Sequence, residues 1–166
     1  LEDPLCFAII GLGKLGGREL TYHSDLDLII VHSGKSNASQ NDRLLIQEYG
    51  VKLIQRTIFL LTTITRSGFA YTMDTRLRPS GNAGVLVTPW EVYFKYHRNS
   101  QAWEHQALVK GRIVAGATTQ LESDGLIETI GEFSKQGWFQ EVELGIEQAA
   151  YKWETPKDLA SQIHHL

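Results

Sequence analysis

Two aspartates, Asp25 and Asp27, stand two positions apart at the start of the apolar run of residues 26–31. If this run is a strand, alternate residues share one face, and the two residues lie roughly 6.5–7 Å apart at Cα. Two anions side by side are unfavourable unless a cation compensates them. Mg²⁺ prefers oxygen ligands and is commonly held by one or two carboxylates together with substrate phosphates. The spacing therefore favours metal-assisted phosphate chemistry.

A third carboxylate follows in the strand-like segment 71–75, where Asp74 precedes Arg76 and Arg78 at intervals of two. If that strand continues, the three side chains share a face, and the guanidinium groups can meet triphosphate oxygens. Two Mg²⁺ ions held about 3.5–4 Å apart by such carboxylates can clamp the attacking and leaving oxygens of a phosphoryl displacement. The residues thus predict a site for nucleotide chemistry.

Other interpretations of these residues stay open at this level. An Asp-x-Asp pair is common, and such pairs also cap helices, bind Ca²⁺ or face solvent. The two arginines can equally form a salt-bridged strand surface. The glycine-rich turn of residues 11–17 favours the nucleotide interpretation, because backbone amides without side chains can approach a phosphate closely.

The glycines at 11, 13 and 16 match G-x-G-x-x-G, the pattern of dinucleotide-binding turns. That fold needs a helix of about three turns after the glycines and an acid at the end of the next strand. Here only nine residues separate Gly16 from Leu26, and the acids begin the strand instead. We therefore interpret the match to the dinucleotide-binding pattern as a chance match. The six histidines form no recognised metal pattern, and no G-x-S-x-G elbow is present.

Composition limits the class of protein. The chain has 166 residues, 42% of them hydrophobic and 21% charged, which suits one domain or one plus part of a second. A formal net charge of −3 gives no reason to expect a nucleic-acid partner. A single cysteine, Cys6, excludes an internal disulfide and indicates a reducing compartment. No apolar run reaches the ~20 residues that span a bilayer, so we expect no membrane association. The chain begins with Leu1, and we expect it to be part of a longer protein.

Hydrophobic periodicity and turn residues predict an α+β fold. We expect strands at 7–10 and 26–31, a helix over 42–61, and strands at 62–65 and 70–77 around a turn at 67–68. A dense turn follows at 79–84. Thr88 and Glu91 are spaced as a capping box that begins a helix. A second helix is expected over 101–114, and helices throughout beyond 118, the last of them opening at Pro156.

Four segments carry a resemblance to a known family. Residues 11–20, 24–28, 74–81 and 103–108 resemble, in order, motifs of glutamate-ammonia-ligase adenylyltransferase, a member of the DNA polymerase β-like nucleotidyltransferase superfamily. The resemblance implies a polymerase β-like nucleotidyltransferase core, a small mixed sheet flanked by helices, followed by a helical segment. It places the catalytic core at residues 1–115 and a helical tail, the start of a following helical domain, at 116–166.

The activity that the resemblance implies is the Mg²⁺-dependent transfer of AMP from ATP to a tyrosine of glutamine synthetase, which regulates nitrogen assimilation. The sequences of residues 78–81 and 103–106 are more similar to the C-terminal, adenylylating domain of that family than to its adenylyl-removing domain. Two alternatives remain, namely the adenylyl-removing domain, which acts by phosphorolysis, and a non-catalytic regulatory module. The implied partners are glutamine synthetase and, through the full-length enzyme, a PII-type signal protein. The implied location is cytoplasmic.

The resemblance also implies roles for individual residues. Asp25, Asp27 and Asp74 would be the catalytic carboxylates and the ligands of two Mg²⁺ ions. Asp74 would also help to deprotonate the tyrosine, whose ordinary pKa near 10 makes it a poor nucleophile. The residues expected to bind nucleotide and phosphate are Gly16, Gly17, Ser24, Arg76 and Arg78.

A last family motif contains Glu104 and His105, for which the sequence defines no role. Trp103 precedes them, and together with Ala107 and Leu108 it has the spacing of one helix face. We therefore expect Trp103 to pack in the core.

Overall fold

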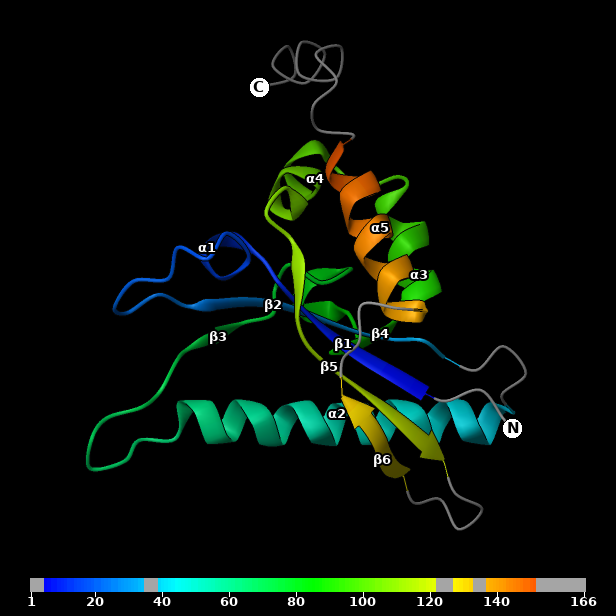
Figure 1. The fold of residues 1–166 in the computed structure, drawn as a ribbon, viewed down its shortest axis with the longest axis horizontal. Coiled ribbons are helices and arrows are strands. Elements are labelled where there is room, and N and C mark those ends of the chain that lie inside the picture. Colours follow the sequence, from blue (N-terminus) through cyan, green and yellow to red (C-terminus); the bar gives the residue numbers. More distant parts are fainter. Residues whose placement is uncertain (1–4, 35–38, 122–126, 133–136, 152–166) are drawn as a thin grey trace.

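The computed structural model describes residues 5–34, 39–121, 127–132 and 137–151. These residues form an α+β fold in which one mixed sheet is covered by helices on both faces (Figure 1). The strands are β1 (Leu5–Gly11), β2 (Leu26–His32), β3 (Met73–Asp74), β4 (Val87–Pro89), β5 (Arg112–Leu121) and β6 (Ile127–Glu132). The helices are α1 (Gly13–Gly16), α2 (Gln40–Thr62), the 3₁₀ turn η1 (Gly81–Ala83), α3 (Trp90–His97), α4 (Ala102–Leu108) and α5 (Trp138–Tyr151).

The sheet has the order β3-β2-β1-β5-β6, and β4 also pairs with β2. β1 lies antiparallel between β2 and β5, and β6 is antiparallel to β5. The outer edge of β2 is divided between two short parallel strands: β3 pairs with residues 26–27 and β4 with residues 30–32. The acidic start of β2 therefore has β3 as its neighbour.

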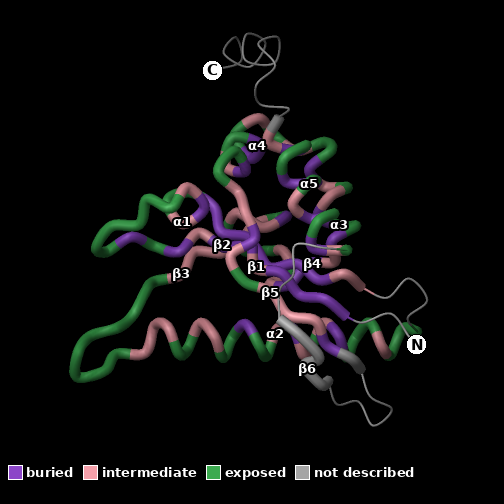
Figure 2. The backbone as a smooth tube through the Cα atoms, viewed as in Figure 1, coloured by how far each residue is buried: buried purple, intermediate pink, exposed green. Residues whose placement is uncertain are grey.

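Alternation along the central strands creates a core on each face of the sheet. On one face Phe7 and Leu28 pack against α2, and on the other Ala8 and Ile10 pack against α3 and α5. Figure 2 shows the buried central strands, and it shows the two long connections near β2 and β3 as exposed. The fully buried side chains on the α3 and α5 side include Leu12, Ile29, Tyr93, Val142 and Ile146.

Helix α2 begins two residues before the expected start because Ser39 caps it. The Ser39 hydroxyl accepts from the Asp42 amide, and the Asp42 carboxylate accepts from the Ser39 amide, which completes a capping box. Gly50 is buried in the middle of this helix. A Cβ there would lie 3.0 Å from the Phe7 ring and 3.3 Å from Val87, so glycine lets the helix approach the sheet closely.

The predicted strands at 7–10 and 26–31, the helix at 42–61 and the turn at 79–84 are confirmed. The strands predicted at 62–65 and 70–77 are wrong for most of their length. Thr62 ends α2, Thr65 and Gly68 form only an isolated bridge, and only Met73 and Asp74 join the sheet. Among residues 62–65, only Thr65 forms a bridge, and it pairs with the nearby Gly68, so the strand propensity of these β-branched residues is not expressed in the sheet.

Two helix predictions also need correction. Thr88 lies in β4, and α3 begins at Trp90 after Pro89 without a side-chain cap, so the capping box from Thr88 to Glu91 is wrong. The helix expected over 101–114 ends at Leu108, and residues 112–121 form β5.

The helical interpretation beyond residue 118 is wrong for residues 118–121 and 127–132, where β5 and β6 extend the sheet, and it is confirmed for α5. Residues 112–119, which include several β-branched residues, pair with the edge of β1 that β2 does not occupy. Hydrophobic periodicity along the chain does not indicate that such an edge is available, so it could not predict this strand. α5 then packs on the core, and the helix expected at Pro156 lies outside the described residues. The division into 1–115 and 116–166 stays a prediction, although β5 runs across residue 115 as part of the sheet.

Among the described residues, no helix combines the length and apolar character that crossing a membrane requires.

The packing of α5 predicts a measurable difference between two of its residues. Ile146 is 1% exposed in the core, whereas Leu144 on the same helix is 49% exposed. We expect Ile146→Ala to lower the free energy of unfolding by about 2–4 kcal/mol through lost burial and a cavity. Leu144→Ala should change it by less than about 0.5 kcal/mol. Urea unfolding of both variants measures this, and equal effects would mean that α5 is not part of the core.

Candidate active site

The candidate site lies at the start of β2, where three acidic residues come together from two strands. Asp27 and Asp74 are directly paired residues of the parallel strands β2 and β3. Asp25 precedes Asp27 by two positions, just before β2 begins. The Leu12 amide donates to the Asp27 carbonyl at 2.9 Å, which ties the turn after β1 to this position. The structure therefore places the three acidic residues that the sequence selected at the same end of β2.

Thr72 connects Asp25 to the strand that carries Asp74. The Leu26 amide donates to the Thr72 carbonyl at 2.9 Å, and the Thr72 hydroxyl donates to Asp25 Oδ1. The hydroxyl thereby satisfies one carboxylate oxygen of an exposed residue. The sequence gave no signal for this contact, because 47 residues separate the two partners.

Arg76 folds back onto Asp74. Its amide donates to Asp74 Oδ1 at 2.8 Å, and its Nε lies 3.0 Å from Oδ1 and 2.9 Å from Oδ2. The Nη2 atom also donates to Oδ2. The Asp74 side chain is 18% exposed, but that of Arg76 is 72% exposed, so the guanidinium approaches from solvent and can leave again.

The site's charges act on one another. Burial first, and then the nearby charges of Asp74 and Asp25, raise the pKa of Asp27, while Arg76 opposes this rise. The hydrogen bonds from Arg76 lower the pKa of Asp74. All three carboxylates help to raise the pKa of Arg76, Asp74 most strongly. One arginine thus compensates a cluster of three acids.

Arg78 has a different environment from the one predicted. β3 ends at Asp74, so the expected alternation of Arg76 and Arg78 along a continuing strand does not occur. Arg78 Nη1 donates to the Thr75 carbonyl at 2.7 Å and to its hydroxyl at 3.0 Å, and Nε donates to the Gly84 carbonyl at 3.3 Å. Arg78 holds the turn after β3 in shape, and its charge also lowers the pKa of Asp74.

Of the predicted phosphate residues, Gly16 ends α1, and Gly17 and Ser24 lie in the connection from α1 to β2. A Cβ on Gly16 would lie 2.1 Å from the Lys110 carbonyl oxygen, so close backbone packing requires glycine there. At Gly17 a Cβ would meet the flexible end of Lys110 at 2.8 Å. The Ser24 hydroxyl is buried and accepts from the Thr21 amide at 3.0 Å, which shapes the loop before Asp25. Their role toward phosphate stays a prediction.

Gly13 is a site residue that the sequence reasoning missed. It has a φ of +51°, and a Cβ on it would lie 2.4 Å from Asp27 Oδ2. Glycine at this position therefore leaves room for the Asp27 carboxylate. The signal that could have identified it is its position as the second glycine of the G-x-G-x-x-G pattern.

Arg112 is a second missed residue, because it fell within a predicted helix. Its Nε donates to the Gly16 carbonyl at 2.9 Å and its Nη2 to the Leu15 carbonyl at 3.1 Å. These bonds satisfy the last carbonyls of α1 from β5. They hold the turn that carries Gly13 against the sheet.

The last motif is structural. Buried Glu104 accepts from the Tyr96 hydroxyl at 2.6 Å and from the Gln101 amide at 2.8 Å. His105 Nε2 lies 3.1 Å from the Ser100 hydroxyl. These contacts join α3 to α4. Trp103 is exposed, so its predicted burial is wrong: the buried face of α4 carries residues 104, 105 and 108 instead.

The carboxylate oxygens of Asp25, Asp27 and Asp74 are ligands that suit a hard cation, although the three side chains do not point to a common metal position. Among the described residues no group of three His, Cys, Asp or Glu side chains is gathered closely enough to hold a metal ion. Thr72 engages Asp25 and Arg76 engages both oxygens of Asp74. Burial and, after it, repulsion from Asp74 and Asp25 raise the pKa of Asp27, and a Mg²⁺ ion bound there would relieve both effects.

A mixed sheet flanked by helices, with carboxylates on two neighbouring strands beside a glycine turn, defines a nucleotidyltransferase-type core. A sequence model of the glutamate-ammonia ligase adenylyltransferase family matches residues 2–125. This chain belongs to that family.

Two curated relatives support the assignment. The chain is 50% identical over 117 residues to the bifunctional glutamine synthetase adenylyltransferase/adenylyl-removing enzyme of Hahella chejuensis, covering 69% of this chain and 12% of that protein. It is 44% identical over 113 residues to the protein of the same name from Vibrio parahaemolyticus, covering 66% of this chain and 12% of that protein. The matched segment is thus a small part of each relative.

The opposite pKa shifts predict opposite effects of neutralising two paired acids. Asp27 has a raised pKa in the folded state, so its ionisation lowers stability as pH rises above about 3.9, the value for an unfolded chain. Asp27→Asn should therefore raise the free energy of unfolding at pH 7, by about 0.5 kcal/mol. The gain should vanish below about pH 3.9.

Asp74 provides the matched comparison. Its lowered pKa contributes stability above about pH 3.9 that is lost as pH falls through the folded value. Asp74→Asn should therefore be destabilising at pH 7 by up to about 1 kcal/mol, because Arg76 is largely exposed. Unfolding curves from pH 3 to 7 test both signs. A loss of stability at pH 7 in Asp27→Asn would contradict the raised pKa of Asp27.

Proposed function

We propose that this chain transfers AMP from ATP to a tyrosine hydroxyl of glutamine synthetase, in a Mg²⁺-dependent reaction. The observation that carries the proposal is the pairing of Asp27 with Asp74 on adjacent strands, with Asp25 two positions before, in a chain of this family. The name of both relatives supports glutamine synthetase as the acceptor.

Asp25, Asp27 and Asp74 are the residues that would hold Mg²⁺, as one or two ions. Mg²⁺ bound there would neutralise the carboxylates and the triphosphate oxygens. Gly13 leaves the Asp27 oxygen accessible from the α1 side. Thr72 and Arg76 would release their carboxylates as the cation and the nucleotide arrive.

The reaction needs a base for the tyrosine, and Asp74 is the proposed one. In the bond network described above, Arg76 lowers the pKa of Asp74 and so makes it a weak proton acceptor. When Arg76 turns toward the triphosphate, Asp74 loses those hydrogen bonds and becomes more basic. Nucleotide binding would thus prepare the base, with Arg76 exchanging one anionic partner for another.

The bond changes are simple. The tyrosine oxygen forms a bond to the α-phosphorus of ATP, its proton passes to Asp74, and the bond from that phosphorus to the bridging oxygen breaks. Pyrophosphate leaves with the negative charge, which Arg76 is placed to stabilise. Arg78 supports this step indirectly by shaping the turn and adding positive charge near Asp74.

We propose the adenylylating direction because residues 78–81 and 103–106 resemble that domain of the family more than the removing domain. The relatives carry both activities in their name, so the assay must separate them. AMP transfer is followed with α-labelled ATP and unmodified glutamine synthetase. Removal is followed as ADP formed from phosphate and adenylylated glutamine synthetase.

The central prediction concerns Asp25 and Asp27, at the start of β2. Asp25→Asn and Asp27→Asn should each reduce the rate of AMP transfer by about 100-fold or more, because each removes a charge facing the reacting phosphates. Label incorporation into glutamine synthetase measures this, with circular dichroism to check the fold. Asp42→Glu, which keeps the α2 cap acidic at a partly exposed position away from the site, is a control expected to retain full activity.

Three outcomes would replace this proposal. Full transfer activity in both asparagine variants would exclude the carboxylates from the reaction. ADP formation without label incorporation would assign the removing direction. A folded chain that shows no Mg²⁺-dependent ATP binding by calorimetry would indicate a non-catalytic regulatory module.

The two arginines should separate by phenotype. Arg76→Ala should raise the KM for ATP about tenfold or more with little loss of stability, because the side chain is exposed and charge-assisted bonds to phosphate are strong. Arg78→Ala should instead lower the free energy of unfolding by about 1–2 kcal/mol, since it removes bonds to two carbonyls. Kinetics and urea unfolding of both variants would reveal a reversed pattern if the roles were exchanged.

A further inference from the structure

A set of large apolar side chains is exposed at the end of α2 and in the connection to β3. Phe59, Leu60, Ile64, Phe69 and Tyr71 are between 42% and 80% exposed, and we refer to these five residues as the apolar rim. Single exposed apolar residues are normal, whereas several that lie together mark a contact surface. Arg66 is the one charged residue in segment 63–71, so few charged groups accompany these exposed apolar side chains.

The apolar rim is held in a defined shape. The Ala70 and Tyr71 amides both lie 3.1 Å from the Leu61 carbonyl, which fixes the returning chain against the end of α2. Thr65 and Gly68 form a closed turn with bonds of 2.8 and 3.1 Å, and Gly68 has a φ of +95°. Ordering apolar groups in water without burying them is unfavourable, so the arrangement indicates a surface prepared for a partner.

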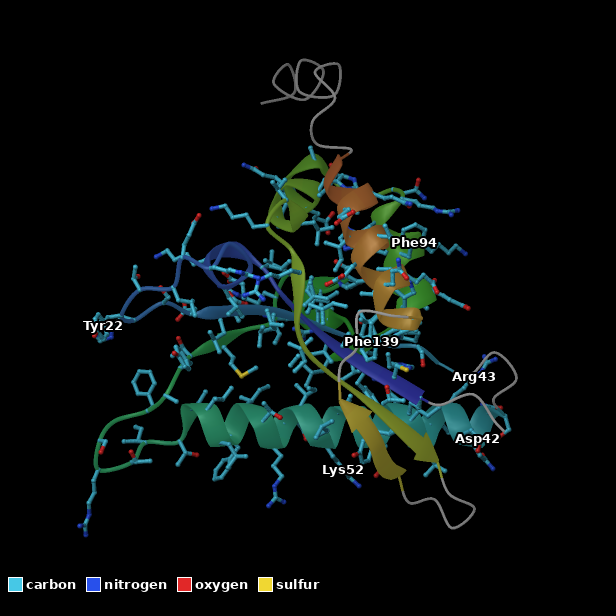
Figure 3. The ribbon with its side chains drawn as sticks, viewed as in Figure 1. Tyr22, Asp42, Arg43, Lys52, Phe94 and Phe139 are labelled. Carbon is cyan, nitrogen blue, oxygen red and sulfur yellow. The ribbon has the colours of Figure 1, made fainter. Side chains whose placement is uncertain are left out.

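The rim leads directly into the candidate active site. Tyr71 precedes Thr72, whose hydroxyl contacts Asp25, and Asp74 follows two residues later. Three extended residues from Tyr71 to Asp74 span about 10 Å. On the other side of β2, the loop of residues 17–25 places Tyr22, which is 98% exposed, at its tip (Figure 3). Both connections project beyond the sheet on the same side of the molecule (Figure 1).

We infer that the apolar rim is the docking surface for the acceptor protein, which binds it through apolar residues around its reactive tyrosine. This inference rests on the proposed function. In the proposed function, ATP is bound by the arginines and, through Mg²⁺, by the carboxylates, so ATP binding does not require the apolar rim. A tyrosine on a folded protein brings its neighbours close to Asp74, and Tyr71, the rim residue nearest to Asp74 in the chain, lies within about 10 Å of it. A second copy or another polypeptide segment seated there would obstruct this approach.

The test uses two variants of the full chain. Ile64→Ser combined with Phe69→Ser removes apolar surface from the rim, and Leu44→Ser removes an equally exposed apolar residue from the far end of α2. Affinity for glutamine synthetase is measured by calorimetry in the Asp27→Asn background, which prevents turnover. AMP transfer is measured with Asp27 intact.

The rim variant should raise both the dissociation constant and the KM for glutamine synthetase about tenfold or more. Its KM for ATP and its kcat at saturating glutamine synthetase should stay within about twofold of the parent. Leu44→Ser should change none of these quantities. If the rim variant melts at a lower temperature than the parent, Phe59→Ser on α2 replaces it.

The outcomes separate the two proposals. Binding that depends on the rim without any AMP transfer supports the docking surface and refutes the proposed function. Transfer with unchanged KM for glutamine synthetase in the rim variant overturns the docking surface alone. The docking surface is also overturned if Leu44→Ser loses as much affinity for glutamine synthetase as the rim variant does. It is likewise overturned if the parent chain is a dimer that the rim variant dissociates while the KM for glutamine synthetase stays unchanged.

Discussion

The parallel pairing of Met73 and Asp74 with the first two residues of β2 is the contact on which the candidate site depends. It is short, and it holds because the Leu26 amide also bonds to the Thr72 carbonyl and because β4 occupies the rest of that edge. The pairing forces two like charges into register, which opposes it. The pairing is accompanied by compensating donors, Thr72 on Asp25 and Arg76 on Asp74.

This compensation links the electrostatics of the site to its proposed chemistry. Arg76 is exposed and bonded to a single carboxylate, so an anion of higher charge can draw it away without disturbing the core. Arg78 cannot move in this way, since its bonds to Thr75 and Gly84 define the turn itself. Two arginines of the same motif thus divide into one that can exchange partners and one that maintains the backbone.

The scaffold is rigid where it supports the acids and exposed where a partner must approach. β1 and β2 are buried on both faces between α2 and the pair α3 and α5, so the position of Asp27 follows from core packing (Figure 2). Arg112 from β5 secures the α1 turn, and Gly13 leaves space beside the carboxylate. The apolar rim then continues from β3 outward. Protein acceptor and nucleotide would accordingly meet at the one strand that contacts both.

The sequence by itself determined the acids, the arginines and the central elements, because buried strands and a long capped helix leave periodic patterns along the chain. It also indicated the family, which the comparisons confirmed. It could not determine which segment fills a sheet edge: residues 112–114 and 118–121 are predicted as helix and 70–77 as a full strand, since local propensity does not record where an unpaired edge lies. Only the tertiary structure decided that Asp74 faces Asp27, that Arg76 rather than Arg78 reaches the acids, and that Gly13 stands beside them. These contacts depend on which segments of the chain become neighbours in the folded sheet, and a local sequence pattern does not contain that information.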